Sequence, residues 1–189
     1  VKKNNVGNNR IMRKILHLST GGTISGCESD YPQIETLSHF FADAIDIGMY
    51  FTKSMKIRAD YSMKEICNKD SRAIADDDRK MMAQEIEKAH EDGVRHFLIT
   101  HGTFTMPDTG VFLLENLPED VLADISIVIT GSMYPMSLVG GDGLLNLGAS
   151  ISSLINVDKP LGVVINMHGK NWDPRKIKKD ADNLVFEEV

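Results

Sequence analysis

The sequence predicts an α/β fold, a three-layer sandwich in which helices cover both faces of a mainly parallel sheet. Short apolar runs alternate along the chain with segments of helical periodicity, which is the pattern of consecutive βαβ units. Three apolar runs are almost continuous in Leu, Ile and Val, as is typical of strands covered on both faces.

We expect five strands, at residues 15–19, 56–60, 96–100, 125–130 and 161–167. Small or polar residues end four of these runs, in the segments 19–23, 100–103, 130–132 and 168–170. Parallel strands bring their carboxyl ends to one edge of the sheet, where open α/β folds bind ligands. Glycines in these segments allow backbone N–H groups to approach a ligand closely, so we expect a site at this edge.

Three helices are expected between the strands. Asp76 can cap the first, which reaches about His90 and ends before Gly93. Its apolar face is formed by Met82, Ile86 and Ala89. Pro107 suits the first turn of the second helix. Asp142 can start the third, whose side chains facing the sheet are Leu144, Leu147, Ile151 and Leu154.

With 189 residues, 42% hydrophobic and 25% charged, the chain has the size and composition of one globular domain. The polar residues 1–13 are expected to form a flexible tail before a single domain at 14–189. No apolar run approaches the ~20 residues that cross a bilayer, and the net charge of −6 disfavours nucleic acid or an anionic membrane as partner. The tail lacks the apolar segment of a signal peptide, and Cys27 and Cys67 make no disulfide framework, so we expect a cytoplasmic protein.

Two segments of the same design carry a family resemblance. Each runs from an apolar strand into a Gly-Thr pair, in Ser19-Thr-Gly-Gly-Thr-Ile24 and in Ile99-Thr-His-Gly-Thr103. Both resemble the signature segments of the bacterial-type L-asparaginases and glutaminase-asparaginases. Similar segments follow in the family's order, at 69–71 with 76–78, at 127–133 with 142–147, and at 173–175 with Lys179. The resemblance covers residues from about 15 to 180 and implies the fold of the large N-terminal asparaginase domain.

The resemblance also implies the chemistry, which is hydrolysis of a small amide. No cofactor is expected, because the glycine pairs form no nucleotide-binding fingerprint and the metal-ligand spacings are missing. Amide hydrolysis needs a nucleophile, a group that accepts its proton, and donors for the oxyanion. By resemblance, Thr23 is the nucleophile, while Thr103 and Lys179 are the second threonine and its proton-relay partner. By the same resemblance, Tyr31 would lie in the lid loop and help to activate Thr23. A buried lysine with a lowered pKa can act as the base that a threonine hydroxyl requires.

The substrate-binding residues follow from the same resemblance, with one departure. Ser71 would hold the substrate carboxylate, and backbone N–H groups near Gly22 and Gly102 would serve the carboxylate or the oxyanion. The family has an aspartate after the second threonine, which binds the α-ammonium of the substrate, but this chain has Phe104. Three consequences stay open: a substrate without a free α-amino group, replacement of the aspartate by another carboxylate such as Asp108, or activity that is low or absent.

The resemblance bears on assembly as well. The family's second, carboxy-terminal domain has no counterpart in these residues, so the chain looks more like the single-domain asparaginase-like proteins of bacteria. Family members assemble as dimers or tetramers, so at least a homodimer is expected.

Other functions have weaker support in the sequence. His101 and His168 both precede a glycine at a strand end, but a metal site would need a third ligand, and no His-x-x-x-His or Cys-x-x-Cys spacing occurs. The leading hypothesis is an asparaginase-like amidohydrolase. The runner-up is a weakened member of the same fold that binds a small amide or amino acid without efficient turnover. The amidase component of a tRNA-dependent amidotransferase ranks last, because the charge is acidic and no RNA-facing segment is visible.

Overall fold

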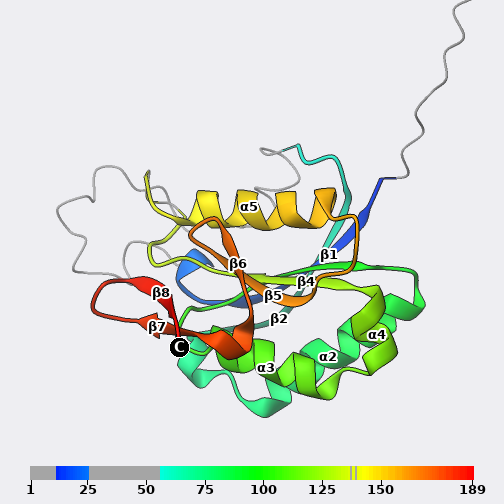
Figure 1. The fold of residues 1–189 in the computed structure, drawn as a ribbon, viewed down its shortest axis with the longest axis horizontal. Coiled ribbons are helices and arrows are strands. Elements are labelled where there is room, and N and C mark those ends of the chain that lie inside the picture. Colours follow the sequence, from blue (N-terminus) through cyan, green and yellow to red (C-terminus); the bar gives the residue numbers. More distant parts are fainter. Residues whose placement is uncertain (1–11, 26–55, 137, 139) are drawn as a thin grey trace, which may run out of the picture.

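The computed structural model of the chain describes residues 12–25, 56–136, 138 and 140–189. A six-stranded sheet, in the order β2-β1-β3-β4-β5-β6, forms its middle layer. Helices α2, α3 and α4 cover one face of the sheet and α5 covers the other (Figure 1). The predicted α/β fold with a mainly parallel sheet is therefore confirmed, since only β6 runs antiparallel to its neighbour.

The central strands are the apolar runs of the sequence. They are β1 (Lys14–Gly21), β3 (His96–Thr100), β4 (Ser126–Thr130) and β5 (Gly162–Met167). Residues facing opposite sides of β3 are equally buried, as Leu98 and Ile99 show, because helices cover both faces. The strands end in register, with Thr100 beside Thr130 and Thr130 beside Asn166, so their polar ends meet at one edge.

The strand predicted at 56–60 is wrong in position. Lys56 has a left-handed backbone, and β2 spans Asp60–Lys69 instead. It is an edge strand whose residues are mostly exposed and polar. Polar residues there disfavour pairing with another chain, but they leave no apolar pattern in the sequence. Periodicity alone therefore could not locate it.

The first two predicted helices form where expected. α2 spans Asp76–Glu91, and α3 spans Met106–Asn116 with Pro107 in its first turn. Asp76 does not cap α2, however, because Ala75 holds the N-cap position. The Asp78 carboxylate instead accepts the Ala75 N–H at 2.9 Å and the Lys69 ammonium at 2.7 Å. The short helix α4 (Glu119–Asp124) was not predicted, because its 6 residues are too few to show a helical periodicity.

Helix α5 spans Gly143–Asn156 and begins after Asp142, as predicted. Leu147, Ile151 and Leu154 are buried against the sheet, but Leu144 is 43% exposed and does not face it. The Asp142 carboxylate accepts N–H groups of Met133 and Tyr134 rather than capping its own helix.

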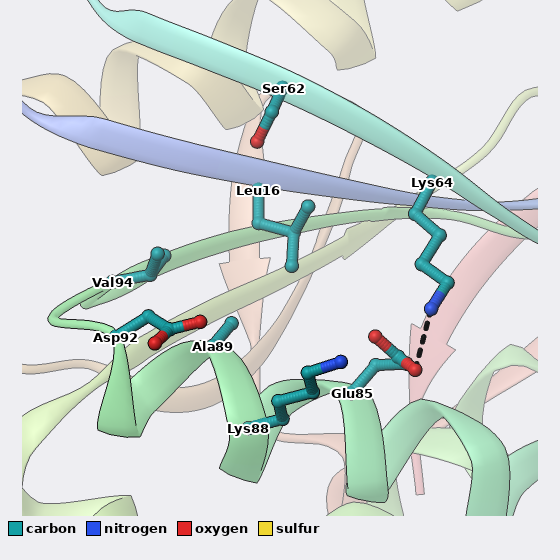
Figure 2. A pocket seen from close by; sticks show the side chains of 8 residues that line it. All are labelled: Leu16, Ser62, Lys64, Glu85, Lys88, Ala89, Asp92 and Val94. Carbon is teal, nitrogen blue, oxygen red and sulfur yellow. Dashed lines mark ion pairs between the residues drawn. The ribbon is translucent and has the colours of Figure 1, made fainter.

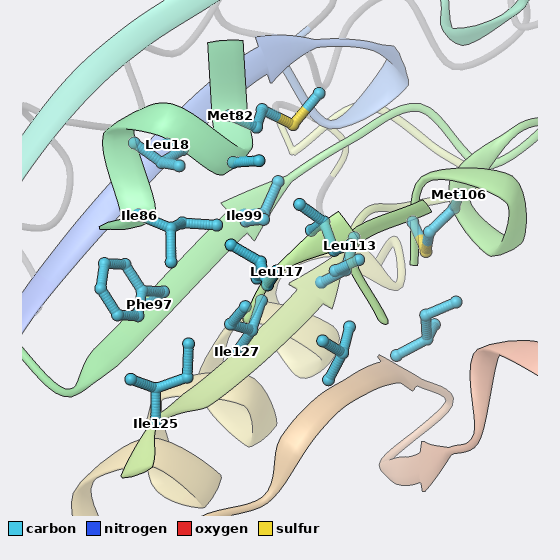
Figure 3. Close-up of a cluster of buried hydrophobic side chains, with 14 of the residues drawn as sticks. Leu18, Met82, Ile86, Phe97, Ile99, Met106, Leu113, Leu117, Ile125 and Ile127 are labelled. Atoms are coloured by element: carbon cyan, nitrogen blue, oxygen red, sulfur yellow. The ribbon is translucent and has the colours of Figure 1, made fainter. Parts of the chain in front are cut away.

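Two apolar clusters hold the layers together. The larger lies between the sheet and α2, α3 and α4, where side chains from both layers interlock (Figure 3). Its largest fully buried side chains include Phe97, Ile99, Met82, Ile86 and Leu113. The smaller cluster packs Leu98 and Val128 against α5. Burial of these faces fixes the sheet whose carboxyl edge carries the site.

The chain after β5 contains elements that were not predicted. Strand β6 (Lys170–Trp172) turns back along β5, and the 3₁₀ turn η6 (Pro174–Lys176) follows. Strands β7 (Ile177–Asp180) and β8 (Val185–Glu188) then form a separate antiparallel hairpin, which holds Lys179. Of the predicted tail, Arg13 is described, and its guanidinium donates to the carbonyls of Leu154 and Val157.

A polar network crosses the buried interior of the sheet. The ring of His17 lies between the Tyr61 hydroxyl at 2.5 Å and the Thr100 hydroxyl at 2.8 Å. Complete burial lowers the pKa of His17 to about 3, so the ring is neutral in the folded chain.

This burial predicts a loss of stability in mild acid. An unfolded histidine titrates near pH 6.5, so between about pH 6.5 and 3 the unfolded chain binds a proton that His17 in the folded chain does not bind. The free energy of unfolding should fall there by up to about 1.4 kcal/mol per pH unit from this residue. Urea unfolding at several pH values measures how steeply the free energy of unfolding depends on pH. This dependence should be weaker in His17→Gln, because glutamine forms hydrogen bonds but does not titrate. An unchanged pH dependence in the variant would show that His17 is not its cause.

Candidate active site

Two Gly-Thr loops meet in direct backbone contact at the carboxyl edge of the sheet. Gly22 follows β1 and Gly102 follows β3. A Cβ atom on Gly22 would lie 2.5 Å from the Cα atom of Gly102, closer than any side chain allows. Gly22 also has a φ of +78°, which favours glycine. Thr23 and Thr103 are the residues that directly follow the two glycines in contact.

Ser71 joins the contact from a third segment. A Cβ atom on Gly102 would lie 2.7 Å from the Cβ atom of Ser71. The Ser71 hydroxyl accepts the Phe104 N–H at 3.2 Å, and the Thr105 hydroxyl donates to the Ser71 carbonyl at 2.6 Å. Gly22 N–H donates to the Lys69 carbonyl at 3.1 Å. The three segments are therefore tied to one another by packing and by hydrogen bonds.

A chain of buried hydrogen bonds, called the buried relay below, supports the loop that contains Gly102. His101 Nδ1 lies 2.8 Å from the Gly102 carbonyl, which can only accept, so Nδ1 carries the proton. Nε2 then accepts from the Thr109 hydroxyl at 2.9 Å, and that hydroxyl accepts from Arg79 at 3.1 Å. Burial lowers the pKa of His101 to about 4, which keeps the ring neutral and the relay intact at neutral pH.

Lys179 completes the cluster from the β7–β8 hairpin. Its ammonium donates to the Thr103 hydroxyl at 2.8 Å, and it lies 3.7 Å from the centre of the Phe104 ring. Burial and then the Arg72 guanidinium lower the pKa of Lys179, because both disfavour the charged amine. Thr103 is buried, so this pair has the character of a base beside a hydroxyl.

Packing around the hairpin fixes where Lys179 lies. A Cβ atom on Gly110 of α3 would lie 2.6 Å from Pro174, so glycine lets η6 pack directly on the helix. Ile177 and Phe186 are buried in the larger apolar cluster. The Phe186 N–H donates to His168 Nε2 at 3.2 Å. The hairpin is thus held against the sheet edge at both strands.

The structure brings most of the predicted site residues together. Contacts join Gly22, Gly102, Ser71, Thr103, Phe104 and Lys179. Thr23 begins the 3₁₀ turn η1 (Thr23–Ser25) and is half-buried. Asp108 is exposed in the first turn of α3, and among the described residues no hydrogen bond or ion pair connects it to the others. Tyr31 and Cys27 lie outside the described residues.

The sequence reading missed several supporting residues. Thr109 and Arg79 lie in the relay behind His101, and Arg72 lies beside Phe104 and acts on Lys179. A glycine inside a predicted helix is a usual signal of close packing, so Gly110 could have been found in this way. The relay had no such signal, because its partners become neighbours only on folding.

The structure gives little support to a metal centre. No group of three or more His, Cys, Asp or Glu side chains is arranged for a metal ion within the part of the chain that is described. His101 and His168 are each engaged in the hydrogen bonds given above.

No described helix is long and apolar enough to cross a membrane.

A pocket of about 240 Å³ lies elsewhere, between β1, β2 and the second half of α2 (Figure 2). Leu16 and Val94 line it together with the ion pair of Lys64 and Glu85, whose charged atoms are 2.6 Å apart. It contains none of the site residues. The polar and titratable side chains lie together at the two Gly-Thr loops instead, and we place the candidate site there.

The sheet, the two Gly-Thr loops and the lysine define a domain of the asparaginase type. Residues 14–184 match the family described as asparaginase, N-terminal, and the chain belongs to this family. It is 28% identical over 167 residues to a glutaminase-asparaginase of Acinetobacter glutaminasificans, which covers 87% of this chain and 49% of the relative. It is 32% identical over 132 residues to L-asparaginase 1 of Escherichia coli, covering 68% of this chain and 36% of the relative.

Solved structures agree with the sequence relatives. The probable cytoplasmic L-asparaginase of Campylobacter jejuni is similar with a TM-score of 0.78 and 30% identity, over 93% of this chain and 53% of that one. The thermostable L-asparaginase of Thermococcus kodakarensis has a TM-score of 0.71 and 25% identity, over 93% and 51%. The chain thus spans about half the length of these relatives or less.

The loop contact predicts a costly substitution. Gly22→Ala should lower the free energy of unfolding by about 2–4 kcal/mol, because the methyl group meets the Gly102 backbone and the backbone is left-handed. Gly93→Ala is the matched control, since Gly93 has a φ of +84° with open space around it, and should cost only about 1–2 kcal/mol. Urea unfolding of both variants measures the difference. Equal costs would mean that the close approach does not constrain the fold.

Proposed function

We propose that the chain is an amidohydrolase of the asparaginase type, which releases ammonia from the side-chain amide of asparagine or a related small amide. The observation that carries the proposal is the hydrogen bond from Lys179 to Thr103, beside the contact of the two Gly-Thr loops. This arrangement combines a hydroxyl, an amine of lowered pKa that can act as a base, and nearby backbone N–H donors. These are the groups that amide hydrolysis requires.

In the proposed reaction Thr23 attacks first. Its oxygen bonds to the amide carbon, and its proton passes to the base. The carbon–nitrogen bond then breaks, and the nitrogen leaves as ammonia after taking a proton. Water attacks the acyl ester on Thr23, which releases the acid and restores the hydroxyl. Thr103 and Lys179 relay the protons, and N–H groups near Gly22 and Gly102 receive the charge on the carbonyl oxygen.

Ammonia release from the purified chain with asparagine, glutamine and short amides tests the proposal. Thr23→Ala should lower kcat by at least about 10³-fold, and Thr23→Ser should restore part of it, because a hydroxyl is needed. Ser25→Ala is the matched control, since it removes a hydroxyl two residues on in the same turn. If Thr103→Ala abolishes turnover while Thr23→Ala does not, Thr103 is the nucleophile and our assignment is wrong.

The pH profile tests the role of Lys179 as the base. Activity should rise with pH through the lowered pKa of Lys179, since only the neutral amine accepts a proton. Arg72→Gln removes a cation that lowers this pKa, so the rising limb should move to higher pH. Arg175→Gln is a matched control, because Arg175 binds Asp173 as Arg72 binds Asp70. A limb that stays in place in Arg72→Gln would refute the assignment.

A specific observation favours the second candidate, a member of the fold that binds an amide or amino acid without efficient turnover. The Phe104 ring lies on the Lys179 ammonium, and an amine held there is less available as a base. Binding of asparagine without ammonia release from the unaltered chain would select this candidate.

Assembly and location are the remaining parts of the proposal. We place the protein in the cytoplasm as at least a homodimer, which sizing with light scattering tests directly. The Campylobacter jejuni neighbour is described as cytoplasmic, whereas a Haemophilus influenzae relative is described as periplasmic.

A further inference from the structure

Two cations surround the side chain that follows Thr103. The Phe104 ring centre lies 3.7 Å from the Lys179 ammonium and 4.7 Å from the Arg72 guanidinium carbon. The ring is 46% exposed, so a ligand at Thr103 meets both the ring and the positive charge beside it. The side chains here therefore present an apolar surface beside two cationic groups, of which Arg72 is paired with Asp70.

The carboxylates that act on Lys179 are already engaged. Asp70 and Asp142 each raise the pKa of Lys179 through their charge. Asp70 accepts Nε and NH2 of Arg72 at 2.9 and 2.8 Å. Asp142 accepts two backbone N–H groups and the Asn146 amide at 2.9 Å. Within the described residues, no unengaged carboxylate contacts Thr103, Phe104 or Lys179.

This charge distribution favours binding of amide substrates that carry a carboxylate over those that also carry an ammonium group. An ammonium group on a substrate would meet like charges at Lys179 and Arg72, and among the described residues it would find no unengaged carboxylate. A carboxylate would be attracted by the same two cations, and the Phe104 ring offers apolar contact to plain methylene groups.

We propose that the site takes half-amides of short dicarboxylic acids, compounds with a carboxylate and a primary amide but no ammonium, in preference to asparagine. Succinamate, which is asparagine without its amino group, represents the class. The inference rests on the proposed function for the reaction, but it concerns recognition and can be tested without turnover.

Calorimetry with the Thr23→Ala chain provides that test, because blocked turnover leaves both compounds intact. Succinamate should bind at least about tenfold more tightly than asparagine, the smallest effect expected for one charge-assisted contact. Equal affinities, tighter binding of asparagine, or no binding of succinamate would overturn the inference. If succinamate binds as expected but the unaltered chain releases no ammonia from it, the proposed function fails while the recognition stands.

Variants at position 104 test the cause. Phe104→Asp places a carboxylate between the two cations and should shift the affinity ratio towards asparagine by at least about tenfold. Phe104→Leu is the matched control, because it removes the ring without adding charge and should keep the preference for succinamate. The inference is wrong if the two variants have the same ratio. Circular dichroism confirms that each variant is folded.

Discussion

The site depends on a contact between two stretches of backbone without side chains. Gly22 lies so close to Gly102, and Gly102 so close to Ser71, that a methyl group at either glycine would overlap its neighbour. This approach brings together chain segments about eighty and thirty residues apart and joins the ends of β1 and β3 with the end of β2. The threonines at the next positions lie on loops that follow these strands, and the strands are fixed by the apolar layers.

Lys179 reaches this place by a different route. It belongs to a hairpin outside the main sheet, and its position depends on Gly110, on two buried side chains and on one hydrogen bond to His168. Burial and the Arg72 guanidinium both lower the pKa of Lys179, so a larger fraction of the amine is neutral and able to accept a proton. Phe104 acts against this, because its ring stabilises the charged form.

The sequence predicted the parts of the fold in which burial leaves a pattern. β3, β4 and β5 were found because they are nearly continuous apolar runs, and the helices α2, α3 and α5 because their apolar residues follow the helical period. β2 was misplaced because an exposed edge strand has no such pattern, and β7 and β8 were missed because they are four residues long. The site residues came from motif resemblance, whereas the relay through His101 and the position of Arg72 come from folding alone.

The central claim is that the loop contact builds an acyl-transfer centre at Thr23. The most direct measurement is rapid acid quenching of the chain during turnover of whichever amide it hydrolyses fastest, followed by peptide mass spectrometry. We predict an acyl ester on the peptide that contains Thr23. An ester on Thr103 or Ser71, or ammonia release with no ester at any time point, would contradict it.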